Sequence, residues 1–134
     1  MIVVGYDGSD CAHAALDYAI GLAKELGDEV LVTYGYEPSG IGEEKAAHRD
    51  AIHEIGQRVV DEGVKAATDA GVKAAAALIP ELPIDALLSM GAEHDARAIV
   101  VGTYGEHPIK GAILGSTPYK LVQLADRPVV VVPA

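Results

Sequence analysis

Residues 98–120, AIVVGTYGEHPIKGAILGSTPYK, contain the features that decide the fold of this chain. They begin with a short apolar run, 98–101, which is rich in β-branched residues and too short for a globular helix, so it predicts a buried strand. Four glycines follow, and Ser116 and Thr117 precede a helical pattern that starts at Pro118. This combination suits a phosphate group, because glycine lets backbone N–H groups approach an anion and the helix dipole adds positive potential.

The spacing of the glycines narrows the choice of motif. Gly102 and Gly105 are separated by two residues, and nine more residues precede Gly115 and Ser116. The segment lacks the GK[ST] ending of a Walker A loop and does not fit GxGxxG. The alternative is an ordinary connection between a strand and a helix, in which the glycines only turn the chain.

Composition excludes several classes of protein. With 134 residues, half of them hydrophobic and 22% charged, residues 1–134 are expected to fold as one globular domain. The formal net charge of −10, with no Trp, no Phe and no basic run, argues against nucleic acid and anionic membranes as partners. A lone cysteine and the lack of a long apolar run lead us to expect a cytoplasmic protein.

Strand-like and helical patterns alternate along the whole chain. The predicted strands are 2–6, 30–36, 72–79, 98–101 and 128–132, and the predicted helices are 10–26, 43–70, 84–93 and 118–125. Because parallel neighbours need helical crossovers, this alternation predicts an α/β fold with a single doubly wound, five-stranded parallel sheet and helices on both faces. Ligands bind such sheets where the winding direction switches. If the first and fourth strands flank that point, Asp7 and Gly102 face one crevice.

Local signals define the helix ends and the faces expected to be buried. Ser9 or Asp10 is expected to cap the first helix, and Gly27 to end it. In the longest helical pattern, the residues expected to face the core are Ala47, Ile52, Ile55, Val59 and Val64.

Two end segments and the glycine spacing carry a family resemblance. The opening VVGYDGSD, residues 3–10, and the closing pattern ARAIVVGTYG, LGS and RPVVVVPA resemble the universal stress protein family, in its ATP-binding branch. The nucleotide loop of that branch reads G-x2-G-x9-G-[ST]. The resemblance covers the whole chain, and the expected strand order of the sheet is 3-2-1-4-5.

The resemblance implies an adenine nucleotide site, whose contact residues would be Asp7, Gly35, Val101, Gly102, Gly105, Gly115, Ser116 and Thr117. Asp7 would contact the ribose or adenine, and Gly35 would let adenine lie against the backbone. Val101 and Gly102 would line the nucleotide. Gly105 would turn the loop, and the three residues from Gly115 would hold phosphates through N–H and hydroxyl groups.

Two departures from the family pattern leave the exact nucleotide open. Relatives often place a basic residue where this chain has Glu106, and a second hydroxyl where it has Pro118, which has no N–H to donate. ATP, with Mg²⁺, is the expected ligand, and AMP or cyclic AMP is the alternative. The implied function is a stress-response sensor or signalling module, and the alternative from another class is a dimeric scaffold without nucleotide.

The resemblance also implies a homodimer, paired through the last strand at Val129 to Val132. An exposed apolar edge would otherwise favour aggregation, which agrees with such pairing. No catalytic residue is predicted, because Ser9 and Ser116 lack a GxSxG motif and no general base is evident, so at most slow ATP hydrolysis is expected. The five histidines show no metal-ligand spacing, and Cys11 is interpreted as a half-buried helix residue.

Overall fold

The computed structural model describes residues 1–38, 42–104 and 114–134, and its strands and helices alternate as expected. In chain order they are β1 (Ile2–Gly5), α1 (Asp10–Leu26), β2 (Val30–Gly35), α2 (Glu43–Asp69), β3 (Ala74–Ile79), α3 (Pro83–Glu93), β4 (Ala98–Gly102), α4 (Ser116–Leu124) and β5 (Val129–Val132). The largest differences from the predicted bounds are the starts of β3 and α4, each displaced by two residues. The helix α4 begins before Pro118, because proline is tolerated in a first turn whose N–H groups need no helical partner.

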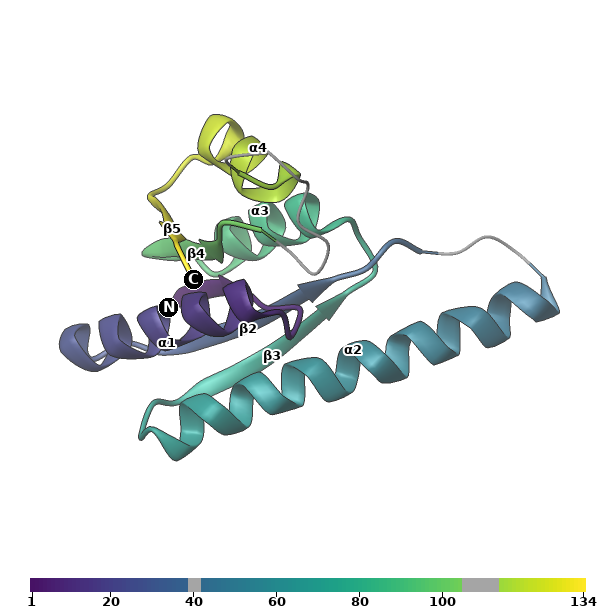
Figure 1. The fold of residues 1–134 in the computed structure, drawn as a ribbon, viewed down its shortest axis with the longest axis horizontal. Coiled ribbons are helices and arrows are strands. Elements are labelled where there is room, and N and C mark those ends of the chain that lie inside the picture. Colours follow the sequence, from purple (N-terminus) through teal and green to yellow (C-terminus); the bar gives the residue numbers. More distant parts are fainter. Residues whose placement is uncertain (39–41, 105–113) are drawn as a thin grey trace.

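The five strands form one parallel sheet in the order β3-β2-β1-β4-β5, which confirms the predicted topology. The central strand is β1: Ile2 pairs with Val30 of β2 on one side and with Ala98 of β4 on the other. The chain therefore winds outward from β1 in both directions, and the switch between the two windings lies between β1 and β4. Figure 1 shows α1 and α2 on one face of the sheet and α3 and α4 on the other.

Alternate residues of the same strands fill two separate cores. Val4 and Val100 face α1 and α2 and pack with Leu16, and all three are fully or almost fully buried. Val3 and Ile99 point the other way, toward α3 and α4. Because both faces are covered, the strands are apolar throughout rather than alternating, which is typical of parallel sheets.

The end signals of α1 were predicted correctly. The hydroxyl of Ser9 accepts a hydrogen bond from the Ala12 N–H at 3.2 Å, so Ser9 is the N-cap. Gly27 ends the helix in the left-handed conformation, with φ of 64°.

The expected core face of α2 is wrong for its first half. Ala47 is exposed, Ile52 is half-buried and the side chain of Ile55 is 49% exposed, whereas Val59 and Val64 do pack against the core. The reason is length: 27 residues of helix span about 40 Å, about twice the length of the strands beneath it. Figure 1 shows the start of α2 extending beyond the sheet.

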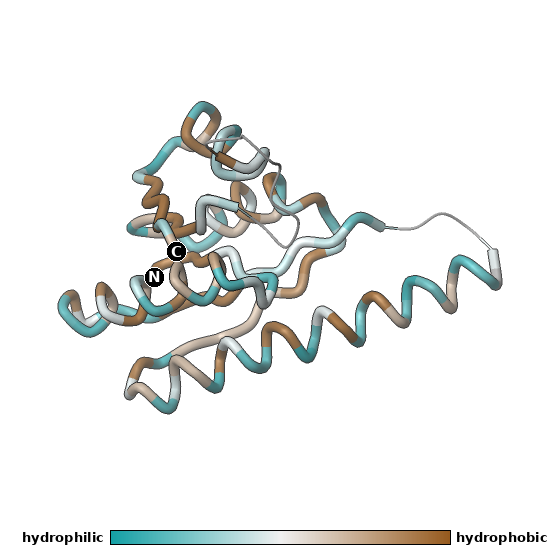
Figure 2. Tube along the Cα trace, in the orientation of Figure 1, coloured by the Kyte–Doolittle hydropathy of each residue, from teal (hydrophilic) through white to brown (hydrophobic). Residues whose placement is uncertain are grey.

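Small residues make the contact between α2 and the sheet. The buried positions are Gly56, Val60, Gly63 and Ala67. A Cβ on Gly56 would lie 2.6 Å from Cδ1 of Leu78, and one on Gly63 would lie 2.7 Å from Cγ1 of Val32. Figure 2 shows hydrophobic residues recurring along α2. The helix comes closest to the sheet at Gly56 and Gly63, so the spacing of the hydrophobic residues alone does not identify its buried face.

Candidate functional site

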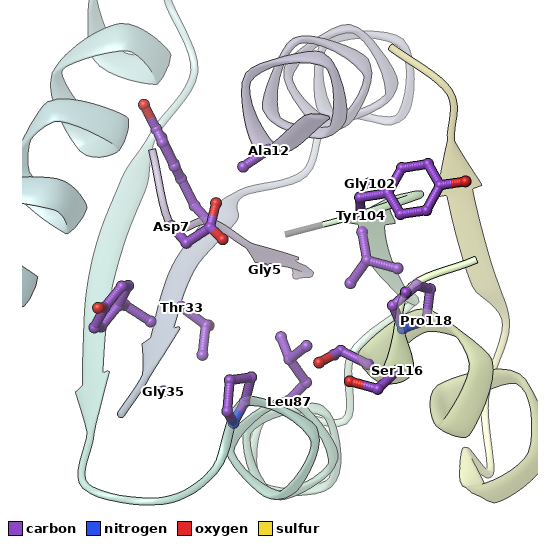
Figure 3. Close-up of a pocket in the computed structure, with 16 residues that line it drawn as sticks. Gly5, Asp7, Ala12, Thr33, Gly35, Leu87, Gly102, Tyr104, Ser116 and Pro118 are labelled. Atoms are coloured by element: carbon purple, nitrogen blue, oxygen red, sulfur yellow. The ribbon is translucent and has the colours of Figure 1, made fainter. Parts of the chain in front are cut away.

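A cavity of about 250 Å³ lies at the carboxyl ends of β1, β2 and β4, at the switch between the two windings (Figure 3). The first turns of α1, α3 and α4 close it through Ala12, Pro83 and Ser116, among others. Seven of the eight predicted contact residues line this cavity: Asp7, Gly35, Val101, Gly102, Gly115, Ser116 and Thr117. The eighth, Gly105, lies outside the described residues. The topology therefore brings residues from four distant parts of the sequence to one place.

Asp7 is held at the cavity by a local turn. One carboxylate oxygen, Oδ1, accepts a hydrogen bond from the backbone N–H of Ser9 at 3.0 Å. Among the described residues, the other oxygen has no hydrogen-bond partner, and Figure 3 shows the carboxylate at the cavity. The turn thus fixes the side chain and leaves one acceptor for a ligand hydroxyl or amine.

Gly102 and Gly35 both lie where the sheet closely approaches the start of a helix. A Cβ on Gly102 would lie 2.6 Å from the carbonyl oxygen of Cys11, in the first turn of α1. A Cβ on Gly35 would lie 2.8 Å from the carbonyl oxygen of Glu81 and from Cα of Pro83, at the start of α3. Close helix packing around the cavity therefore requires both glycines, and the contact of Gly35 with adenine stays a prediction.

The start of α4 forms a polar end of the cavity. Its N-cap is Gly115, whose N–H donates to the carbonyl of Thr103 at 2.7 Å and joins the two ends of the intervening loop. Among residues 1–38, 42–104 and 114–134, no side chain caps this helix, so within them the N–H groups of Ser116 and Thr117 are available to an anion, as the helix dipole favours. Pro118 follows and contributes no N–H.

The opposite end of the cavity is mostly apolar, and the sequence analysis missed its residues. Pro83 of α3 lies there beside Gly35, and Leu87 lies beside Gly5 in the middle of the cavity, next to Ser116 (Figure 3). Thr33 could have been found from the sequence: it lies two residues before Gly35 on a strand, and side chains two apart share a face.

The charge of the cavity is low. The lining residues that the structure describes include one carboxylate, that of Asp7, and no Lys, Arg or His. Glu106 and Lys110, the charged residues of the predicted loop, lie outside the described residues. Within the described lining, an anion would therefore depend on backbone N–H groups, hydroxyls and the α4 dipole.

Tyr6 forms part of the cavity wall and links it to α2. Its hydroxyl donates to Glu62 at 2.9 Å and lies 3.2 Å from Nδ1 of His13. Burial, together with the hydrogen bond to Glu62, raises the pKa of Tyr6 well above its ordinary value. The phenol is therefore neutral at physiological pH and adds no negative charge beside Asp7.

The described residues contain a thiol, but neither a metal cluster nor a membrane-spanning helix. The Cys11 thiol lies 3.6 Å from the hydroxyl of Thr103, with which it shares a weak hydrogen bond. In the described ranges, no group of three or more His, Cys, Asp or Glu side chains is arranged to hold a metal ion. No helix within those ranges is long and apolar enough to cross a membrane.

The chain is similar to known proteins in both sequence and fold. The model of the universal stress protein family matches residues 1–133. The universal stress protein YxiE of Bacillus subtilis is 30% identical over 146 residues, which cover 98% of this chain and 97% of that protein. A universal stress protein crystallised in complex with cAMP is 26% identical, with a TM-score of 0.75 and coverage of 98% and 94% of the two chains. The universal stress protein from Archaeoglobus fulgidus in complex with dAMP is 24% identical, with a TM-score of 0.73 and coverage of 98% and 95%.

Proposed function

Because the chain belongs to the universal stress protein family, we propose that its cavity binds an adenine nucleotide and that the protein acts as a nucleotide-dependent sensor or signalling module in a stress response. The observation that carries the proposal is the arrangement of the cavity. An apolar end beside β2 suits a planar base, uncapped N–H groups at α4 suit phosphate, and Asp7, two residues after β1, lines the same cavity. Solved relatives in complex with cAMP and with dAMP support this choice of ligand.

ATP, held with Mg²⁺, is the first candidate, since the spacing from Gly102 to Ser116 follows the loop of the ATP-binding branch. Two observations favour AMP or cyclic AMP as the second candidate. The described lining offers no cationic side chain, and Pro118 contributes no N–H at the polar end. A monophosphate places fewer negative charges there than a triphosphate does.

A titration of the nucleotide-free protein tests both candidates. Protein stripped of retained nucleotide is titrated calorimetrically with ATP, AMP and cyclic AMP in the presence of Mg²⁺. Binding of at least one of them is expected, and the order of affinities identifies the ligand. If none of the three binds, the protein is a scaffold and the proposal is wrong.

We also propose that two copies pair through β5. This strand lies at the edge of the sheet, and its four valines are half-buried rather than covered. Next to it, α4 leaves Tyr119, Val122 and Leu124 more than half exposed. An apolar edge with an apolar flank is a surface that a partner copy would cover.

Sedimentation velocity over a range of concentrations tests the pairing. The expected mass is twice that of the 13.9 kDa chain. A single species of monomer mass at every concentration would contradict it.

A further inference from the structure

One small polar side chain at the cavity is deeply buried. Apart from Tyr6, whose hydroxyl donates to Glu62, Thr33 is the only buried residue with a polar side chain among the described residues, at 2% exposed. It lies on β2 between two neighbouring strands, paired with Gly5 of β1 and Ala77 of β3. It also lines the cavity, so its hydroxyl is shielded from bulk water but adjoins the space for a ligand.

The hydrogen bonding of Thr33 is incomplete. Its hydroxyl donates to the carbonyl of Leu31 at 3.3 Å, a long bond within the same strand. No donor among the described residues reaches the hydroxyl oxygen, so its acceptor capacity is unused. Buried polar atoms are usually paired, and one that adjoins a cavity can be paired by a ligand. With its proton already directed to Leu31, this oxygen matches a donor.

The position of Thr33 identifies the part of the ligand that it would meet. Figure 3 shows Thr33 and Gly35 on the side of the cavity opposite Ser116 and Pro118. Pro83 borders Gly35 on that side and offers neither a charge nor an N–H group there, which disfavours a phosphate and favours a base. The phosphate would lie at the start of α4, so the base edge is the group near the Thr33 hydroxyl.

We propose that Thr33 selects an amino group on the base: its Oγ1 accepts a hydrogen bond from the exocyclic amine at position 6 of adenine. A keto oxygen at the same position, as in hypoxanthine, would place an acceptor against an acceptor as long as the hydroxyl donates to Leu31, and binding it would require the hydroxyl to give up that bond and rotate. This inference rests on the proposed function, because it assigns a specificity-determining residue to the same cavity. Sites that hydrogen-bond a ligand group discriminate strongly against analogues that lack it.

The test compares three monophosphates with matched ribose and phosphate groups. AMP carries an amine at position 6, inosine monophosphate carries a keto oxygen, and purine riboside monophosphate carries only hydrogen. The wild-type protein is expected to bind AMP more tightly than either analogue. Replacing Thr33→Val removes the hydroxyl and keeps the side-chain shape, and it should weaken AMP binding about fivefold, the effect of losing one neutral hydrogen bond. The affinity of the Thr33→Val protein for purine riboside monophosphate should change less than twofold. The Thr33→Ser protein should retain the preference for AMP.

Matched controls separate this effect from a change in the fold. Thr68→Val removes a hydroxyl that also donates to a backbone carbonyl, at 2.8 Å, on the exposed face of α2 away from the cavity. It should leave all three affinities unchanged. The discrimination by the wild-type protein needs no variant and so does not depend on how a substitution folds.

Each remaining outcome contradicts a distinct claim. Equal affinities of the wild-type protein for AMP and purine riboside monophosphate would overturn the inference about Thr33 and leave the nucleotide site intact. The same conclusion would follow if Thr33→Val weakened the binding of AMP and of purine riboside monophosphate equally, or weakened neither. If the wild-type protein bound none of ATP, AMP and cyclic AMP, the proposed function itself would fail.

Discussion

Replacing Gly102→Ala should lower the free energy of unfolding by about 2 to 3 kcal/mol, the upper range for an inserted methyl group in a packed interior. The new Cβ would lie 2.6 Å from the carbonyl oxygen of Cys11, 2.7 Å from its Cβ and 2.8 Å from its carbonyl carbon. Two of these atoms belong to the backbone of α1, so no side-chain rotation relieves the overlap. Either α1 or the end of β4 has to move.

Urea unfolding of wild type and variant measures the effect. Gly21→Ala is the matched control, because Gly21 lies on α1 and its added Cβ would have no atom within 4 Å. That control should be stabilised by about 0.5 to 1 kcal/mol, since alanine favours a helix more than glycine does. A Gly102→Ala protein within 0.5 kcal/mol of the wild type would contradict the packing described for this position.

Replacing Gly115→Val should weaken nucleotide binding tenfold to about a hundredfold and leave the domain folded. Gly115 has φ of −68°, which any residue adopts, so the substitution does not strain the backbone. Its Cβ would lie 3.3 Å from the carbonyl oxygen of Thr103 and 3.4 Å from Cα of Tyr104, which is tight but tolerable. The γ-carbons of valine add volume beside the polar end, and an overlap of 1 to 3 kcal/mol corresponds to that loss of affinity.

Calorimetric titration of the variant with the ligand that the wild type prefers measures the loss. Gly115→Ala provides a graded comparison, with a smaller expected effect, and the thermal midpoint of each variant reports on folding. An unchanged affinity in a folded Gly115→Val protein would mean that the ligand does not approach the start of α4.

Most of the fold could be predicted because its signals are local. Ser9 and Gly27 mark the ends of α1, and the apolar runs mark strands that are covered on both faces. The buried face of α2 could not be predicted in the same way. It is chosen by how closely Gly56 and Gly63 allow the helix to approach the sheet, a tertiary property that a hydrophobic period does not encode.

The candidate site, too, could be predicted where its signals are local and not where they depend on tertiary packing. The polar end follows from the spacing of Gly102, Gly115 and Ser116, and the structure places these residues at one cavity. The reason for Gly102 required knowledge of α1, which lies about ninety residues away in sequence and against β4 in space. The spacing of Thr33 from Gly35 places both on one face of β2, but the importance of Thr33 comes from its burial beside a cavity, which only the structure shows.

The central place of β1 also affects how the chain matures during synthesis. The strand is made before the other elements of the sheet, and β2 can pair with one of its edges once residue 30 has emerged. Its other edge awaits β4, so Ile2 stays unpaired on that side until Ala98 has been translated. The nascent chain thus carries an open, apolar strand edge until β4 is made, a state that invites mispairing and chaperone binding. The cavity, which needs both β4 and α4, cannot be complete before both have been translated.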